Sequence, residues 1–125
     1  MVDERYVEEE IRKARLAFTD AERLASSGGS DEGVVNRLYY AAFHAAQAVL
    51  YDRGVEPASH GAVRNCFGSE VVLEEDATRE QGRLLTTLAD LRQQADYGYE
   101  TLEADVDQLI EETSTFVEDM ATLVE

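Results

Sequence analysis

The sequence contains few of the residues that identify several common protein classes. It has one cysteine, Cys66, one proline, Pro57, and no tryptophan among its 125 residues. A single cysteine cannot form a disulfide within the chain. No apolar run of eighteen residues or basic leader segment occurs. These absences predict a cytoplasmic protein without a membrane span.

Lysine and positive charge are also scarce. The chain has 27 acidic and 11 basic residues, a net charge of −16, and Lys13 is its one lysine. Acidic, lysine-poor surfaces suit concentrated salt, because screening then confines charge repulsion to about 3 Å at 1 M. We therefore expect a halophilic source, specifically a haloarchaeon. Since affinity for phosphate comes from clustered Lys and Arg, any contact with RNA has to be local.

Signatures of metal and triad chemistry are missing as well. The sequence has no helical Glu-x-x-His pair, no paired cysteines, no phosphate-cradling glycine loop and no serine in a nucleophile motif. We expect no metal and no cofactor. The length and the absence of a linker predict one domain over residues 1–125.

Helical periodicity is present along almost the whole chain, with apolar residues recurring three and four positions apart. Long helices are predicted over residues 3–25, 31–53 and 78–97, and from a cap at Thr101 to the C-terminus. A short helix is predicted over residues 59–67, followed by an acidic surface connection over residues 70–77. The pattern indicates an all-α fold, an antiparallel up-and-down bundle of four long helices plus one short helix.

The second predicted helix carries a group of polar residues on one face. At about 100° per residue, these residues share one stripe: Arg37, Tyr40, His44, Gln47 and Tyr51. A guanidinium can hold two phosphate oxygens, and an imidazole can transfer protons near neutral pH. The stripe is therefore suited to metal-free phosphodiester chemistry. Spacing alone nevertheless favours a buried polar seam, with Arg37 paired to a carboxylate such as Asp96.

Three small residues, Ala41, Ala45 and Ala48, flank this stripe and would let another helix approach closely. That helix could belong to a second copy in a dimer or to the same chain, and the sequence favours neither.

Two further pairs of residues are predicted to have minor roles. Arg92 and Asp96 lie one turn apart and are expected to form a surface ion pair, although an inward Asp96 could orient Arg37 or His44. Arg53 and His60 repeat the spacing of Arg37 and His44. We interpret this repetition as incidental, because Gly54 and Pro57 interrupt the helix between them.

Three segments together resemble a known family. They are Asn36-Arg37-Leu38-Tyr39-Tyr40-Ala41-Ala42-Phe43-His44-Ala45-Ala46, then Arg53-Gly54-Val55-Glu56-Pro57 with His60, and finally Arg92-Gln93-Gln94-Ala95-Asp96-Tyr97. The combination resembles the HEPN domain (higher eukaryotes and prokaryotes nucleotide-binding domain) of the type found beside minimal nucleotidyltransferases. The likeness covers about residues 5–120. It implies a helical bundle that dimerises, often as the toxin of a pair whose antitoxin is the nucleotidyltransferase.

The resemblance also implies roles for individual residues. In active relatives, an arginine and a histidine separated by four to six residues form a metal-independent RNase site, usually at the dimer cleft. Arg37 and His44 have six residues between them. Arg37 would bind the scissile phosphate, and His44 would be the general acid or base for attack by the ribose 2′-hydroxyl. The expected binding residues are Asn36, Tyr40, Gln47, Tyr51 and Asp96.

The sequence departs from active relatives at two positions. Leu38 follows the arginine where those relatives typically have a polar residue. Ala46 stands where some toxins have a tyrosine that the partner enzyme modifies with adenylate.

Three functions therefore stay open at this point. The first is a ribonuclease toxin, and the second is a non-catalytic subunit that binds a nucleotide or substrate for a nucleotidyltransferase. The third is an assembly module in which the stripe is an internal seam. Leu38 and the acidic surface favour the second, and the matched motif favours the first.

Overall fold

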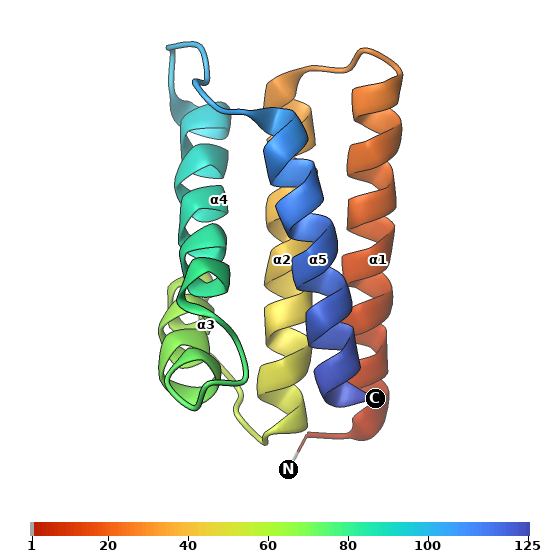
Figure 1. Cartoon of the computed structure of the whole chain (residues 1–125), viewed down its shortest axis with the longest axis vertical. Coiled ribbons are helices and arrows are strands. Elements are labelled where there is room, and N and C mark those ends of the chain that lie inside the picture. The colour runs from red at the N-terminus through yellow and green to blue at the C-terminus, as the bar shows by residue number, and fades with distance from the viewer. Residues whose placement is uncertain (1) are drawn as a thin grey trace.

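The computed structural model describes residues 2–125, and over that range the chain has five α-helices, a π-helical turn and no strand. The elements in order are α1 (Glu4–Ser26), α2 (Asp31–Asp52), α3 (His60–Phe67), the turn η1 (Gly68–Val72), α4 (Arg79–Tyr97) and α5 (Val106–Val124). The four long helices alternate in direction, and α1 begins at the end of the bundle where α5 finishes (Figure 1). The predicted all-α fold is confirmed.

Side-chain caps determine where the helices begin. The Ser30 hydroxyl accepts the backbone N–H of Gly33 at the start of α2, and Thr78 forms a reciprocal capping box with Gln81 at the start of α4. The predicted cap of the last helix, Thr101, is wrong. Asp105 caps α5 instead, because residues 101–105 stay outside the helix while Leu102, 8% exposed, packs into the core.

Helix α2 lies at the centre of the bundle, and α1, α4 and α5 pack around it (Figure 1). Ala41, Ala45 and Ala48 are fully buried, and Ala48 packs with Val7 and Ile11 of α1. These alanines therefore seat neighbouring helices of the same chain. The alternative that they contact a second copy is wrong for this structure.

The segment after α3 is more buried than predicted. Val71 of η1 and Ala77 enter the core, although the acidic residues between them are exposed. Arg53, at the end of α2, donates to the carbonyl oxygen of Glu70 at 2.7 Å and pairs with Asp76 at 2.6 Å. The prediction of an acidic surface connection over residues 70–77 is thus wrong at Val71 and Ala77, which are buried.

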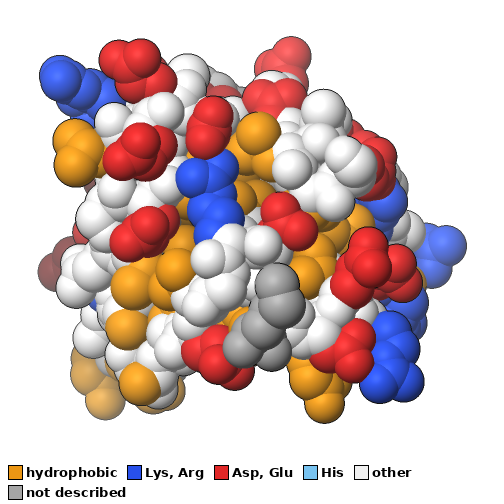
Figure 2. All heavy atoms as spheres, turned by 90° about the horizontal axis from the view of Figure 1, so that it is seen from below, with side chains coloured by type: hydrophobic (Ala, Val, Ile, Leu, Met, Phe, Trp, Pro, Cys, Tyr) orange, Lys and Arg blue, Asp and Glu red, His pale blue; other side chains and the backbone are white. Residues whose placement is uncertain are grey.

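The acidic charge is spread over the surface. Figure 2 views the bundle from the end where α1 begins and α5 finishes, and shows Asp and Glu side chains scattered around apolar patches and a few basic side chains. Arg15 of α1 pairs with two exposed carboxylates, Glu118 of α5 and Glu125, the residue after that helix. Among residues 2–125, no helix combines the length and apolar character needed to cross a membrane.

Candidate active site around Tyr40

The polar stripe of α2 is partly exposed to solvent and is not sealed in the core. Its five residues all have intermediate exposure, whereas the residues between them, from Leu38 to Leu50, are buried. His44 in particular keeps 21% of its side chain accessible. The stripe is therefore an edge of α2 that a ligand can reach.

His44 is held by a carboxylate from another helix. Its Nδ1 lies 2.6 Å from Oε2 of Glu10, a residue of α1 whose side chain is only 11% exposed. A carboxylate accepts a hydrogen bond here, so the proton of the neutral imidazole belongs on Nδ1 and the lone pair on Nε2. Among residues 2–125, no protein group is hydrogen-bonded to Nε2. The arrangement is that of an oriented base.

Sequence reasoning missed Glu10, although a signal was present. Glu10 stands three residues after Val7 and four before Ala14, both of which are buried. An acidic residue on the apolar stripe of a helix needs a polar partner, because burying an unpaired carboxylate is strongly unfavourable. The partner is His44.

Arg37 is also positioned by a neighbour. Its Nε and Nη2 donate to the side-chain oxygen of Asn36 at 3.1 and 2.7 Å, and its guanidinium carbon lies 5.1 Å from the centre of the Tyr40 ring. One amide oxygen engages only part of a guanidinium with five N–H donors. Arg37 therefore keeps donors for an anion while its plane is fixed.

Helix α4 adds a second guanidinium. Arg92 lies 4.9 Å from the Tyr39 ring centre and 5.9 Å from that of Tyr40, and it pairs with Asp96 at 3.1 Å. The predicted ion pair exists, yet Arg92 faces the aromatic rings of α2 and is 23% exposed. Asp96 thus forms the predicted ion pair with Arg92, and among residues 2–125 no hydrogen bond or ion pair joins it to Arg37 or His44.

His60 joins the site without Arg53, which bonds to Glu70 and Asp76, so the repeated spacing of the two residues is incidental as interpreted. Its Nδ1 lies 2.8 Å from the hydroxyl of Tyr39, and its ring stacks on Phe43 with centres 4.1 Å apart. Burial, then the charges of Arg92 and His44, lower the pKa of His60 below its ordinary value. The loop containing Pro57 interrupts the helix, but it returns the chain to α2 and so places His60 there.

Four side chains surround the ring of Tyr40, and together with it we call them the Tyr40 cluster. Its members are Arg37, Tyr40, His44, His60 and Arg92. They come from α2, α3 and α4, and the ring centres of His44 and His60 lie 6.3 and 6.2 Å from that of Tyr40. Two guanidiniums and two imidazoles thus gather on a strongly acidic protein.

Two predicted binding residues lie further along α2. Tyr51 packs beside Val7 and Ile11, and burial, followed by the nearby acids Glu10 and Glu56, raises the pKa of its phenol. Gln47 is partly exposed on the same helix edge. Neither belongs to the Tyr40 cluster.

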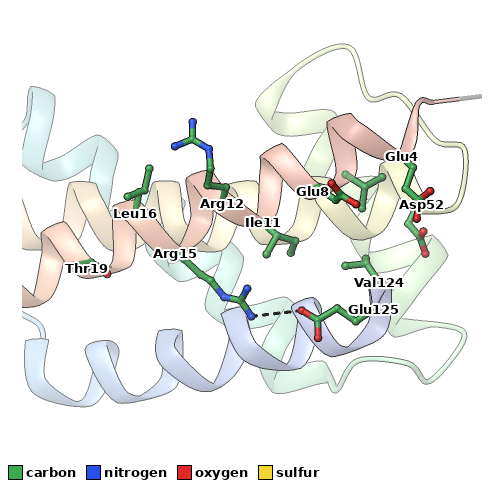
Figure 3. Close-up of a pocket in the computed structure, with 11 residues that line it drawn as sticks. Glu4, Glu8, Ile11, Arg12, Arg15, Leu16, Thr19, Asp52, Val124 and Glu125 are labelled. Atoms are coloured by element: carbon green, nitrogen blue, oxygen red, sulfur yellow. Dashed lines mark ion pairs between the residues drawn. The ribbon is translucent and has the colours of Figure 1, made fainter.

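A separate hollow lies between α1 and the end of α5 (Figure 3). It has a volume of about 530 Å³, and its lining includes Ile11, Leu16 and Val124. Figure 3 shows Arg15 reaching across it toward Glu125. No member of the Tyr40 cluster lines this hollow. Among residues 2–125, no three His, Cys, Asp or Glu side chains are grouped to hold a metal ion.

The HEPN domain family model matches residues 7–123 of this sequence. The chain belongs to the HEPN domain family. The predicted family is thereby confirmed, while the haloarchaeal source stays a prediction.

Named HEPN relatives include proteins of bacteria and archaea. The chain is 29% identical over 124 residues to a UPF0332 protein of Thermotoga maritima, covering 98% of this chain and 93% of that protein. Two proteins of Methanocaldococcus jannaschii carry the name "Putative toxin". They are 35% and 29% identical over 67% and 74% of this chain. The chain spans 63% of the length of each of these two proteins.

The sequence differs from active HEPN members at two positions, and both lie in the core of this structure. Leu38 and Ala46 are both fully buried. The Leu38 side chain therefore packs into the bundle and lies away from the Tyr40 cluster. Its apolar character serves the core and leaves the donors of Arg37 unchanged.

Proposed function

We propose that this HEPN protein is the toxin of a toxin–antitoxin pair and acts as a metal-independent endoribonuclease at a homodimer cleft. The observation that carries the proposal is the pair formed by His44 and Glu10, because it orients an accessible imidazole with Nε2 free. Arg37, held by Asn36 on the same helix edge, is the phosphate-binding group. The two relatives named as toxins support the biological class.

The proposed reaction is attack of a ribose 2′-hydroxyl on the adjacent phosphorus. Nε2 of His44 takes the 2′-hydroxyl proton while the new P–O2′ bond forms and the P–O5′ bond breaks. The departing 5′-oxygen takes a proton from water, which leaves a 2′,3′-cyclic phosphate and a 5′-hydroxyl, and His44 later returns its proton to the solvent. The guanidinium of Arg37 stabilises the charge that builds on the phosphoryl oxygens.

A homodimer would complete the site by bringing Arg37 of one copy close to His44 of the other. Arg37 and His44 of one chain lie seven residues apart, roughly 10 Å along the α2 axis. If the productive pair consists of Arg37 from one copy and His44 from the other, mixing Arg37→Ala and His44→Ala chains will restore part of the activity. If both residues act within one copy, the mixture will stay inactive.

RNA cleavage by the purified protein, in high salt with EDTA, tests the function. We expect the native chain to cleave, and Arg37→Ala and His44→Ala each to lose activity by about 10²-fold or more. The matched control is Arg23→Ala, an exposed arginine at the end of α1. Absence of cleavage by the native chain rejects the enzymatic proposal.

The alternative function is a non-catalytic subunit that binds a nucleotide or substrate for a minimal nucleotidyltransferase. The strongly acidic surface favours this alternative, because it opposes binding of a long RNA. Expression of the chain in a host separates the two. Toxicity that requires His44, and that a minimal nucleotidyltransferase encoded beside the chain relieves, supports the toxin. Binding without toxicity supports the subunit.

A further inference from the structure

His60 presents a fixed aromatic ring on the surface of the protein. The residue is exposed, yet one face of its ring covers Phe43 at a centre-to-centre distance of 4.1 Å and an angle of 30°. Phe43 itself is 6% exposed. Because one face of the imidazole is covered, its accessible area lies on the opposite face and the edge.

A second contact fixes the plane of this ring. The hydroxyl of Tyr39 lies 2.8 Å from Nδ1, and Tyr39 is 2% exposed, so its position is determined by the core. An exposed side chain normally keeps its rotamer freedom, and ordering it on binding is unfavourable. For His60 that ordering is already present in the folded protein.

The neighbours of His60 are those expected beside a nucleotide. The Tyr40 ring centre lies 6.2 Å from that of His60 and 6.3 Å from that of His44. The guanidiniums of Arg37 and Arg92 lie 5.1 and 5.9 Å from the same ring. A phosphate held by the guanidiniums would therefore place its nucleobase within reach of the exposed face of His60.

We propose that His60 is a stacking platform for an unpaired nucleobase, and that the substrate is single-stranded RNA. The identity of the substrate as RNA rests on the proposed function, whereas the stacking contact does not. In a duplex, each base is covered on both faces by its neighbours and cannot lie on a protein side chain. Recognition of single strands by stacking on aromatic residues, histidine included, follows from this difference.

Because the protein is strongly acidic, stacking would contribute a larger share of the binding free energy than phosphate contacts do. With a net charge of −16, the chain gains little long-range attraction for a polyanion, and salt weakens phosphate contacts further. Stacking does not depend on release of counterions. The ring is also suited to it, because burial and the facing groups Arg92 and His44 lower the pKa of His60 and favour its neutral form. Tyr39 and Tyr40 face the ring as well.

Two variants separate stacking from other roles of His60. His60→Phe keeps a flat aromatic ring over Phe43 but has no nitrogen to hydrogen-bond or transfer a proton. His60→Leu keeps an apolar cover over Phe43 without a flat ring, so the core contact is retained. Thermal unfolding of both variants verifies that each is folded.

The probe is a short 2′-O-methyl oligonucleotide that contains 2-aminopurine, whose fluorescence falls when the base stacks. The 2′-O-methyl groups remove the nucleophile, so binding is measured whether or not the protein cleaves RNA. We expect the native chain and His60→Phe to quench the fluorescence and to bind alike. His60→Leu is expected to lose the quenching and to bind about tenfold or more weakly.

Two results would overturn the inference. If His60→Phe binds as weakly as His60→Leu, the imidazole nitrogens matter and the platform does not. If the same oligonucleotide in a duplex binds as tightly as the single strand, the substrate class is wrong. Absence of cleavage of natural RNA, with stacking retained, would reject the ribonuclease proposal and leave the platform standing.

Discussion

Replacing Glu10 by glutamine is the most informative single perturbation of the proposed site. The substitution keeps the size of the side chain and removes its charge. Glutamine can present an N–H to Nδ1 of His44, where the carboxylate now lies at 2.6 Å. The imidazole would then carry its proton on Nε2, and a ring protonated there cannot take the proton of a 2′-hydroxyl.

The burial of the His44–Glu10 pair sets the expected loss of activity and of stability. Exchange of the orienting carboxylate for an amide in a serine protease triad reduces turnover by about 10⁴. His44 is 21% exposed, so water can partly replace Glu10, and we expect a loss of about 10²- to 10³-fold. A hydrogen bond to a charged group contributes about 1.5–3 kcal/mol, and glutamine keeps part of it. The unfolding midpoint should fall by about 5 °C.

The assay compares RNA cleavage and thermal unfolding of the native chain, Glu10→Gln and Glu9→Gln. Glu9 provides the same substitution one residue away, where the carboxylate pairs with exposed Arg12. The control should keep its activity and lose little stability. Full activity in Glu10→Gln alongside a lower midpoint would show that the pair only stabilises the fold, and would refute the reasoning.

Four other predictions concern stability. The hydroxyl of Thr113 is fully buried without a partner among residues 2–125, so Thr113→Val should raise the free energy of unfolding by about 1 kcal/mol in urea denaturation. Ala45→Leu overfills the core and should lower the free energy of unfolding by about 1–3 kcal/mol. Ala58→Leu, on the surface, should change this free energy little. Burial and nearby charges lower the pKa of His60 from its ordinary value of 6.5, so the folded chain binds fewer protons there than the unfolded chain. The stability that neutral His60 contributes to the fold is fully present above pH 6.5 and is lost as the pH falls through the lowered pKa. His60→Gln should therefore make the free energy of unfolding change less with pH below 6.5. With a net charge of −16, the unfolding midpoint should rise between about 0.1 and 1 M NaCl, and a constant midpoint would contradict the halophilic expectation.

The helices were predictable because periodicity and capping are local properties. Ser30 and Thr78 cap where the pattern indicates, and the apolar stripe of each helix is the buried one. The start of α5 was not predictable in this way. Both Thr101 and Asp105 are good caps, and the choice depends on burial of Leu102, which is a tertiary contact.

Only part of the site could be predicted from sequence. The stripe with Arg37 and His44 follows from helix geometry within α2. The partners of that stripe come from other helices: Glu10 is 34 residues from His44, and His60 is reached through a loop. Spacing along one helix contains no information on such pairs. For the same reason the sequence could not place the Arg92–Asp96 pair against Tyr40.

The central claim is tested most directly by the chemistry of the cleaved ends. RNA incubated with the native protein in high salt and EDTA should yield a 2′,3′-cyclic phosphate and a 5′-hydroxyl. A substrate with a single 2′-deoxy nucleotide at the cleavage position should stay intact. Cleavage that persists at the deoxy position, or that requires a divalent metal, would contradict the assignment of His44 and Arg37 as a metal-independent ribonuclease site.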